Sequence, residues 1–383
     1  MKKILIFHNQ YIEKGGEDIA VERELNLLKE RYVVEEIILN NKNTGLLETI
    51  IIFLTNSNYK INKIVEKKLD NFQPDLIYIH NLWFSLSLGI FKLFFQRNLP
   101  VYLKIHNFRY FCTRSHMSKK HFLKSTFCQA CGKSKIDMGI YNKYYDSYLK
   151  SIFVNRFGKK FIKIISDKRI TKIVLTKFHK KFLVDLGHSS ENIKVIPNYL
   201  DIKENNNSET KLDNLIYAGR ISKEKGIEDL IIAFKKSNLK TTKLQLIGDG
   251  PDLEKLKREY SDSRVIFKGS LSNDDTLKYI ENSKAVITNT LMYEGQPTLL
   301  CEASALGTLS IFPDNGGISE FFTENYSFKF NQLNNNDLVD KINLLENNEL
   351  VKKEINQIRN NLEEILDKDR VLENFEDIFN DQK

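Results

Sequence analysis

The chain has 383 residues, 41% of them hydrophobic, and a formal net charge of +8. This length exceeds what one compact core usually organises, so the sequence predicts two domains. No apolar run approaches the roughly 18 residues needed to span a bilayer, and the longest candidate, 82–95, is interrupted by Lys92. The apolar run 4–7 is too brief for a signal peptide, so we expect a cytoplasmic protein.

Positive charge is concentrated in one part of the chain. Between Phe91 and Asp185 there are 22 lysines and arginines but only 4 aspartates and no glutamate, so the rest of the chain is acidic overall. Aromatic residues are interleaved with these cations over 141–161. The mixture favours peripheral contact with an anionic membrane surface, and a solvated helix face with core aromatics is the alternative. No nucleic-acid-binding signature accompanies the charge, so we expect no nucleic-acid partner.

Three cysteines form a spacing that metal sites use. Cys112, Cys128 and Cys131 form a C-x15-C-x2-C set, with His116 and His121 between them. Three thiolates and one imidazole can complete a tetrahedral zinc site. Reduced thiols without a ligand are the favoured alternative, since a cytoplasmic chain rarely carries a disulfide framework.

The first half alternates short apolar runs with amphipathic segments, which is typical of a doubly wound α/β domain. The runs predicted to be buried parallel strands are 4–7, 33–39, 75–80, 101–106 and 171–176, with 193–196 closing the series. The predicted helices cover 17–30, 58–70, 86–97 and 137–166. The Asn-rich stretch 203–210 is predicted to be a linker.

A second alternating series follows the linker. Its predicted strands are 214–218, 243–247, 264–267, 285–288 and 309–312, and its predicted helices are 225–236, 251–260, 273–282, 297–306 and 317–322. The remainder of the chain has a helical pattern. Two doubly wound, Rossmann-like domains are therefore predicted, with a ligand cleft between them at the carboxyl ends of the strands.

The segment 293–302 carries the most informative motif. Glu294 and Glu302 stand eight positions apart, across a Gly-x-Pro turn that opens an apolar helix. Pro297 suits the first helical position, where its missing N–H costs nothing. The N–H groups of this helix start would form an anion site beside Glu294. A diphosphate with a polyol at each end fits this arrangement, so the motif indicates a nucleotide-sugar site.

Two further loops with candidate ligand groups follow predicted strands. Arg220 offers a bidentate fork to phosphate, and Lys225, near a helix start, offers a point charge. Gly248 and Asp249 lie in a sharp turn after the next strand, where the backbone could meet a ligand.

Two adjacent glycines precede the first predicted helix. Gly15 and Gly16 let the backbone approach a ligand closely, and the helix start favours negative charge. A plain turn before a helix is the alternative for this pair.

Together these motifs resemble those of the retaining glycosyltransferases of family four, which have the two-domain GT-B fold. The similar elements cover most of the chain, and the pair of glutamates is their most specific part. The resemblance implies that Glu294 contacts the donor sugar and that Glu302 holds the ribose hydroxyls. It implies that Arg220 and Lys225 bind the donor diphosphate. The segments 195–201 and 316–320 are similar to further elements of the family.

The amino-terminal half resembles a narrower branch, assigned to bacterial surface polysaccharide or glycolipid assembly. The similar segments are 15–18 and 106–112, followed by the later cysteine pair. His106 matches the family's strand-end histidine near the sugar and phosphates. Gln296 departs from an apolar or aromatic position and Tyr199 from a common glycine, so donor-sugar contacts and the hinge are expected to differ.

The resemblance implies catalytic roles for Glu294, Arg220, Lys225 and His106. The residues it implies for donor binding are Gly15, Gly16, Gly219, Gly248, Asp249, Gly295, Gln296, Pro297, Thr298, Leu299 and Glu302. We expect no cofactor and no metal in catalysis, and a donor linked to UDP or GDP.

The resemblance also implies how the domains divide the work. Residues 1–200 would form an acceptor-binding domain and 201–365 a nucleotide-sugar-binding domain, with 366–383 a helix packing back on the first. The expected activity is metal-independent, retaining transfer of a sugar to a hydroxyl of a glycan or lipid-linked acceptor. A non-catalytic nucleotide-sugar-binding subunit and a nucleotide-sugar epimerase on the same fold are the alternatives.

Overall fold

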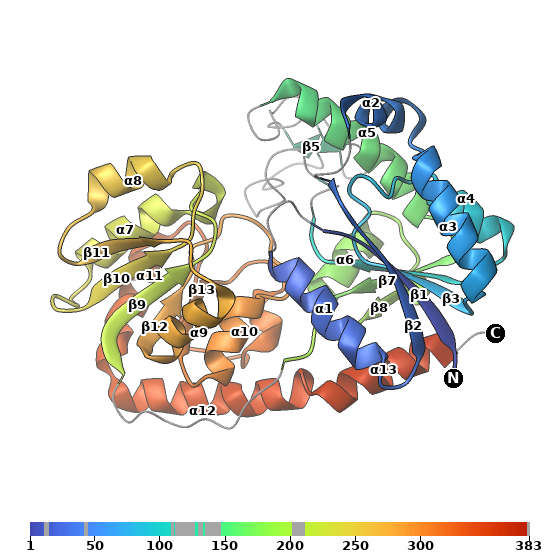
Figure 1. The fold of residues 1–383 in the computed structure, drawn as a ribbon. Helices are drawn as coiled ribbons and strands as arrows, with labels where there is room; N and C mark the ends of the chain where they lie inside the picture. The colour runs from blue at the N-terminus through green and yellow to red at the C-terminus, as the bar shows by residue number, and fades with distance from the viewer. Residues whose placement is uncertain are drawn as a thin grey trace. The chain divides into compact units, whose positions relative to one another are not determined.

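The computed structural model describes residues 1–10, 15–41, 45–108, 111, 127–128, 133–134, 147–200 and 211–380. The chain forms two compact units, each built on a parallel β-sheet with helices on its faces (Figure 1). The first unit comprises Met1–Tyr199 and Lys368–Lys383, and the second comprises Leu200–Asp367. The predicted linker, 203–210, lies outside the described residues.

The first unit contains a six-stranded parallel sheet in the order β2-β1-β3-β4-β7-β8. Its strands are β1 (Lys3–Gln10), β2 (Val33–Asn40), β3 (Leu76–Ile79), β4 (Val101–Ile105), β7 (Ile170–Val174) and β8 (Ile193–Val195). Its helices before the second unit are α1 (Gly16–Leu28), α2 (Leu46–Thr55), α3 (Tyr59–Phe72), α4 (Ile90–Gln96), α5 (Tyr148–Ile165) and α6 (Lys177–Asp185). A short antiparallel pair, β5 (Phe127–Cys128) and β6 (Lys133–Ser134), stands apart from this sheet.

The apolar run of β1 is continuous because both faces of this sheet are covered. Ile4 and Ile6 pack in one core cluster with residues of α1 and α13. Phe7 points to the opposite face, where its ring lies 5.2 Å from that of Phe94 on α4. Successive strand side chains point to opposite faces, so a strand covered on both sides is apolar at every position.

One prediction for this unit was wrong in detail, and two helices were not predicted. The strand predicted at 33–39 to be buried is β2, an edge strand whose residues are mostly accessible to solvent. Helix α2 was not predicted as a separate element. Neither was α6, and the strand predicted at 171–176 ends at Val174, before Thr176. Its hydroxyl instead accepts the His179 N–H at 3.1 Å, which caps the first turn of α6.

The second unit contains another six-stranded parallel sheet, in the order β11-β10-β9-β12-β13-β14. Its strands are β9 (Leu212–Ala218), β10 (Lys243–Ile247), β11 (Val265–Gly269), β12 (Ser283–Ile287), β13 (Leu309–Pro313) and β14 (Lys329–Phe330). Its α-helices are α7 (Ile227–Lys236), α8 (Leu253–Tyr260), α9 (Asn273–Glu281), α10 (Thr298–Ala305), α11 (Asn335–Asn343) and α12 (Asn348–Ile365). The helix predicted at 317–322 is a single 3-10 turn, Ile318–Phe321. Two Rossmann-like α/β domains were predicted, and the structure confirms them.

The last helix belongs to the first unit. Phe375 and Phe379 of α13 (Lys368–Asn380) are fully buried in the core cluster that contains Tyr78. Tyr102 donates its hydroxyl to the Ile378 carbonyl at 2.7 Å, which fastens α13 to the sheet. Among the helices of the described ranges, none combines the length and the hydropathy of a membrane span.

Candidate functional site

Two glycine turns meet at the carboxyl edge of the second sheet. Strands β9 and β10 are neighbours, and they are followed by Gly219 and Gly248. Gly248 has φ +134°, and a Cβ at this position would lie 1.9 Å from the Gly219 carbonyl oxygen. Only glycine allows so close an approach of two backbones. Asp249 continues the contact, because its carbonyl accepts the Ile221 N–H at 2.8 Å.

The loop after β9 presents both predicted cations. Arg220 is exposed, and its carbonyl accepts the hydroxyl of buried Tyr217 at 2.7 Å. Lys225 closes a 3-10 turn before Gly226, which has φ +63° and the left-handed conformation. Asn289 donates to the Gly226 carbonyl at 3.0 Å and so ties this turn to the loop after β12. Asn289 had no sequence signal of its own.

Lys225 and Glu294 form an ion pair. The Lys225 Nζ lies 2.6 Å from Glu294 Oε1, and the Thr290 hydroxyl donates to the same oxygen at 3.0 Å. The two charged side chains are 24% and 29% exposed, so both remain accessible to a ligand. The structure thus brings together two of the predicted catalytic residues, from loops that follow the adjacent strands β9 and β12.

The backbone of Glu294 is held as firmly as its side chain. Its carbonyl accepts the Gly317 N–H at 2.8 Å. A Cβ on Gly316, which has φ +66°, would lie 2.4 Å from that carbonyl oxygen. The segment 316–320 therefore fixes the turn that carries the first glutamate.

Burial and the carboxylates of Glu294 and Glu224 raise the pKa of Tyr217, so its hydroxyl stays protonated.

Helix α10 begins one residue later than predicted. Pro297 has φ −83° and ψ 74°, so it precedes the helix, and Thr298 is the first helical residue. The Pro297 carbonyl accepts the Cys301 N–H at 3.0 Å, the first bond of the helix. Gln296 is 9% exposed and Glu302, on the second turn of α10, is partly buried. The remaining predicted donor residues, Gly295 and Leu299, lie in this turn and in the first turn of the helix.

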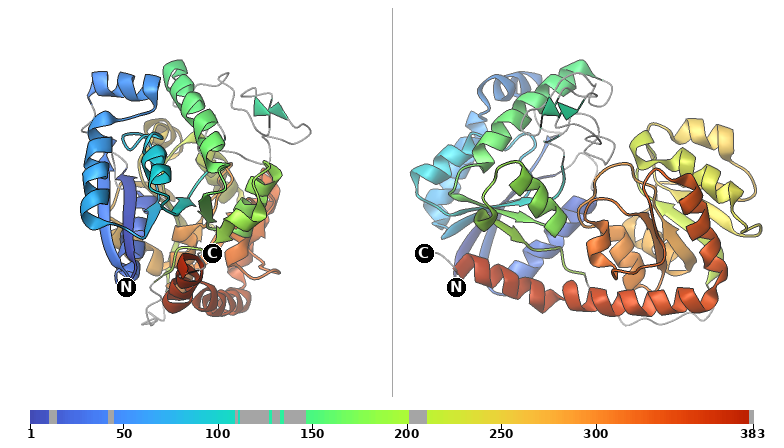
Figure 2. Two further views of the ribbon diagram at one scale, coloured as in Figure 1. Left: turned by 90° about the vertical axis from the view of Figure 1, so that its right-hand side faces the viewer. Right: turned by 180° about the vertical axis from the view of Figure 1, so that it is seen from behind.

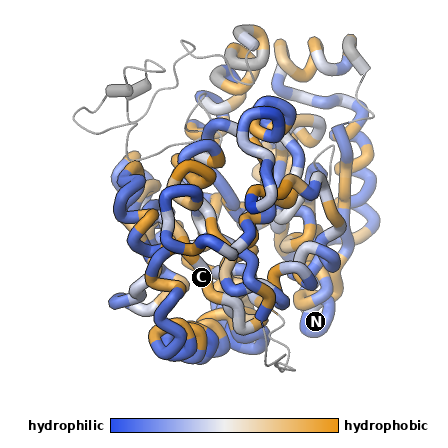
Figure 3. Tube along the Cα trace, turned by 90° about the vertical axis from the view of Figure 1, so that its left-hand side faces the viewer, coloured by the Kyte–Doolittle hydropathy of each residue, from blue (hydrophilic) through white to orange (hydrophobic). Residues whose placement is uncertain are grey.

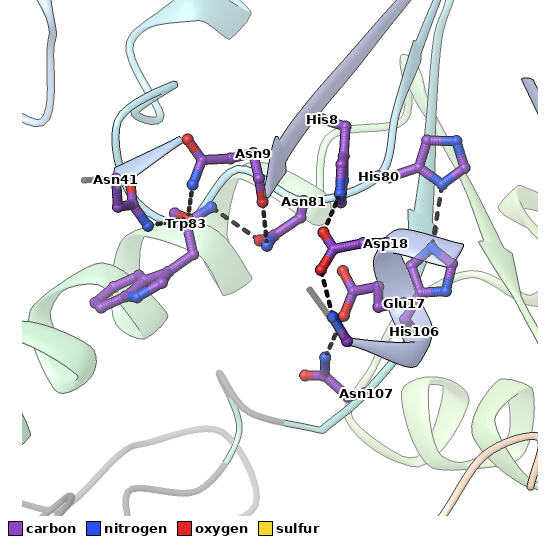
Figure 4. Close-up of polar contacts among 11 residues, drawn as sticks. His8, Asn9, Glu17, Asp18, Asn41, His80, Asn81, Trp83, His106 and Asn107 are labelled. Carbon is purple, nitrogen blue, oxygen red and sulfur yellow. Dashed lines mark hydrogen bonds and ion pairs between the residues drawn. The ribbon is translucent and has the colours of Figure 1, made fainter. Parts of the chain in front are cut away.

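The first unit carries a second polar cluster, at the carboxyl ends of three adjacent strands (Figure 4). A His-Asn pair stands at each end, and the three pairs are His8-Asn9, His80-Asn81 and His106-Asn107. His80 Nδ1 and His106 Nε2 lie 3.1 Å apart, and the His8 and His80 rings meet edge to face at 6.1 Å. Only His106 was predicted. The repeated dipeptide was the signal that could have found the other five residues.

Asparagines of this cluster organise the loop after β3. Asn81 donates to the Asn9 carbonyl at 2.8 Å and accepts the Trp83 N–H at 2.9 Å. The Trp83 carbonyl accepts from Asn9 and, at 2.9 Å, from Asn41. These bonds join the ends of β1, β2 and β3.

The predicted glycine loop is closed by a carboxylate. Asp18 Oδ2 accepts the Gly15 N–H at 2.8 Å, while its Oδ1 lies 2.8 Å from His8 Nε2 (Figure 4). Glu17 accepts from Asn107 at 3.1 Å. Gly15 precedes α1 and Gly16 is its first residue. The Gly15 N–H is therefore already engaged in the protein, and a ligand at this helix start would meet other donors.

A buried charge network lies beneath the histidines. Glu24 accepts from Tyr78 and Lys104, and its Oε1 lies 3.6 Å from His80 Nε2. Burial, with the neighbouring histidines and Lys104, holds the pKa of His80 and of His106 well below the usual value. Both imidazoles are therefore neutral near pH 7.

Most of the predicted zinc ligands fall outside the part of the chain that the structure describes. Cys112, Cys131, His116 and His121 lie outside the described residues, and only the backbone of Cys128 is described. Within the described ranges, no group of three histidine, cysteine, aspartate or glutamate side chains could hold a metal ion.

Comparison with known proteins identifies the fold. Residues 199–364 match the family described as glycosyl transferases group 1. The whole chain superposes on Anabaena HepE in complex with UDP and glucose, with a TM-score of 0.68, 16% identity and complete coverage of both chains. It superposes on sucrose-phosphate synthase from Thermosynechococcus elongatus with a TM-score of 0.73 and 16% identity, covering 99% and 98% of the chains. The protein has the GT-B fold.

A relative with a similar sequence over a shorter region is also described as a glycosyltransferase. The protein described as "Putative teichuronic acid biosynthesis glycosyltransferase TuaC" of Bacillus subtilis (strain 168) is 28% identical over 140 residues. The match spans 37% of this chain and about a third, 34%, of that relative. The residues that match the group 1 glycosyl transferase family, 199–364, include both members of the Lys225–Glu294 pair.

Proposed function

We propose that the protein transfers a sugar from a nucleotide-diphosphate sugar to a hydroxyl of a glycan or lipid-linked acceptor. The observation that carries this proposal is the contact of Lys225 with Glu294 at the carboxyl ends of β9 and β12. A cation beside a carboxylate offers one partner for a diphosphate and one for a sugar hydroxyl. The group 1 glycosyltransferase match to residues 199–364 supports the same activity.

Charge stabilisation of the leaving group is the proposed source of catalysis. As the bond from the anomeric carbon to the diphosphate oxygen breaks, its electron pair stays on that oxygen and adds one negative charge. The Lys225 ammonium has three N–H donors, so it can retain its ion pair with Glu294 while it also binds phosphate. The exposed Arg220 side chain adds a bidentate pair of donors. Both interactions strengthen as the charge develops, so they lower the barrier without a metal ion.

The acceptor step completes the balance. The acceptor oxygen forms the new bond to the anomeric carbon, and its proton passes to an oxygen of the departing diphosphate. We propose that this occurs on one face of the sugar, with retention, as in the family four enzymes that the motifs resemble. His106 is assigned to orienting the donor, because its neutral ring can exchange hydrogen bonds without carrying charge.

The proposed biological setting is surface polysaccharide or glycolipid assembly. The relative from Bacillus subtilis is described as a putative teichuronic acid biosynthesis glycosyltransferase. A further solved structure with a similar fold is described as the lipopolysaccharide outer core galactosyltransferase WaaB. We propose a cytoplasmic protein that binds peripherally at the inner face of the cell membrane. The cations between Phe91 and Asp185 support this placement.

Alanine substitution tests the donor site. Arg220→Ala, Lys225→Ala, Glu294→Ala and Glu302→Ala should each lower release of nucleoside diphosphate from a UDP- or GDP-sugar by about a hundredfold. Lys223→Ala is the matched control, because Lys223 is exposed in the same 3-10 turn and has no assigned role. Turnover near the wild-type rate in all four variants would show that the donor site is assigned wrongly.

Two alternatives have distinct outcomes. A binding-only accessory subunit would be stabilised by nucleotide sugars in a thermal-shift screen but would release no nucleoside diphosphate. An epimerase would change the configuration of the donor sugar without consuming the nucleotide sugar. Transfer to an added acceptor, with one nucleoside diphosphate released per sugar, excludes both.

A further inference from the structure

Helix α2 has an apolar stripe on its outer face. Leu47, Ile50, Ile51 and Leu54 are 77%, 43%, 54% and 60% exposed. They stand at positions i, i+3, i+4 and i+7, so they share one face of the helix. On the opposite side Ile52 is buried. A helix that is apolar on both sides normally lies inside a core, so this exposed face is expected to have a partner.

Helix α2 is held against a basic helix by residues outside the stripe and by its backbone. The Phe53 and Phe153 rings lie 3.9 Å apart, and Arg156 of α5 donates to the Phe53 and Leu54 carbonyls at 3.0 and 2.8 Å. Helices α2 and α5 accordingly lie side by side (Figures 1 and 2). These contacts fix the last turn of α2, so the stripe is a preformed surface.

Charge on the two helices is strongly one-sided. Helix α5 carries five lysines and arginines and no acidic residue over Tyr148–Ile165. Lys159 and Lys163 are exposed on it. Glu48 is the acidic residue of α2, and it accepts from buried Asn58 at 2.8 Å, which engages it with the protein. An exposed aliphatic stripe therefore adjoins a helix that carries five cationic residues and no acidic residue.

We propose that α2 and α5 together form a docking surface for an anionic lipid bilayer. The stripe consists of leucine and isoleucine, whereas protein interfaces are anchored by tryptophan, tyrosine and arginine. Figure 3 shows α2 at the top of the view, coloured hydrophobic along most of its length. An apolar helix face lying in the plane of a membrane, with cations beside it for lipid phosphates, matches the requirements of interfacial binding.

The apolar surface continues inward from the stripe. A pocket between α2, α5 and the loop after β3 is lined by Phe53, Phe153, Phe157, Trp83 and Phe84. The Trp83 carbonyl is bonded to Asn9 and Asn41 of the polar cluster. The proposed membrane face thus adjoins the loop that carries this cluster. This inference rests on the proposed function only in placing a lipid-linked acceptor at the same membrane.

Vesicle co-sedimentation of the full chain tests the surface. Wild type should bind vesicles of equal parts phosphatidylcholine and phosphatidylglycerol, and bind pure phosphatidylcholine far more weakly. Leu47→Gln with Leu54→Gln keeps good helix formers and should weaken binding to the anionic vesicles by about tenfold or more. Lys159→Glu with Lys163→Glu should abolish the preference for anionic lipid.

A matched control uses exposed apolar residues on other helices of the same unit. Ile64→Gln with Val184→Gln, at positions 47% and 38% exposed, should bind as wild type. Equal binding by the α2 variant and this control would overturn the proposal. So would light scattering that shows a wild-type dimer which the α2 variant loses, since the stripe would then contact a second copy.

The same variants separate this proposal from the proposed function. Hydrolysis of a nucleotide sugar in detergent-free solution should stay at the wild-type rate in the α2 variant, because Leu47 and Leu54 have no part in the donor site. Loss of vesicle binding with retained hydrolysis supports the surface. Retained vesicle binding in the absence of any hydrolysis would leave the surface in place and contradict the transferase.

Discussion

The imidazoles of His80 and His106 lie with Nδ1 and Nε2 3.1 Å apart, each at the end of its own strand. One nitrogen must donate and the other accept, so the two rings fix each other's tautomer. The Glu24 carboxylate, 3.6 Å from His80 Nε2, favours a proton on that nitrogen. His80 Nδ1 then accepts from His106 Nε2, which leaves His106 Nδ1 without a proton.

Removal of His80 should release the tautomer of His106. In His80→Phe, nitrogen NMR of histidine-labelled protein should show a mixture of His106 tautomers where wild type has one. Turnover should fall by about tenfold, since the ring no longer presents a fixed acceptor. His188→Phe is the control, because it changes a buried histidine outside the cluster. An unchanged His106 spectrum in His80→Phe would contradict the assignment.

Removal of only one member of the Glu24–Lys104 ion pair should destabilise the protein. Both side chains are buried, so Lys104→Met alone leaves the carboxylate without its cation and should lower the free energy of unfolding by about 3–5 kcal/mol. The double variant Lys104→Met with Glu24→Leu removes both charges and should recover most of this loss. Urea unfolding measures both, and a double variant less stable than the single one would refute the ion pair.

Gly248 should tolerate no side chain. In Gly248→Ala the new Cβ would meet the Gly219 carbonyl, so the two turns must separate. We expect the free energy of unfolding to fall by about 2–4 kcal/mol and nucleotide-sugar binding to be lost. Gly187→Ala is the control, since Gly187 has φ +93° but open space around it. Its loss should be about 1 kcal/mol, from backbone strain alone. Equal losses in the two variants would show that the close approach does not matter.

Acid should destabilise the protein partly through His179. Burial lowers the pKa of His179 from 6.5 to about 3, and its ring packs 4.3 Å from that of Phe108. Below pH 6.5 the unfolded chain binds a proton that the folded chain refuses until about pH 3. As far as this histidine is concerned, the free energy of unfolding is therefore highest above pH 6.5. It falls by about 1.4 kcal/mol per pH unit below that value.

His179→Phe isolates this contribution. The variant should lose less stability than wild type on acidification from pH 7 to pH 5, by about 2 kcal/mol. Urea unfolding at the two pH values measures the difference. Parallel losses in both proteins would mean that His179 is protonated in the folded state.

Metal removal should leave donor turnover unchanged. Arg220 and Lys225 supply the positive charge in the proposed mechanism, so release of nucleoside diphosphate should persist in excess EDTA. Dialysed protein with and without added Mg²⁺ gives the comparison. Turnover that disappears in EDTA and returns with Mg²⁺ would require a metal in the reaction.

The sequence predicted the strands well because parallel strands covered on both faces are apolar throughout. The run 4–7 lies within β1, and 243–247 coincides with β10. Prediction failed where tertiary position decides exposure. The run 33–39 contains apolar residues like those of the other predicted strands, yet β2 lies at the edge of the sheet. In the sequence, the apolar residues of α2 resemble those of a buried helix. Only the folded structure shows that the stripe is exposed to solvent.

By itself the sequence determined the α/β class, the two units and the loops that carry charge, because hydrophobic period and glycine positions are local properties. Only the tertiary structure decided which loops meet. Lys225 and Glu294 are 69 positions apart, and their contact exists because β9 and β12 are neighbours in the sheet. The three His-Asn pairs became one cluster for the same reason. Strand order is set by long-range packing, which no local pattern encodes.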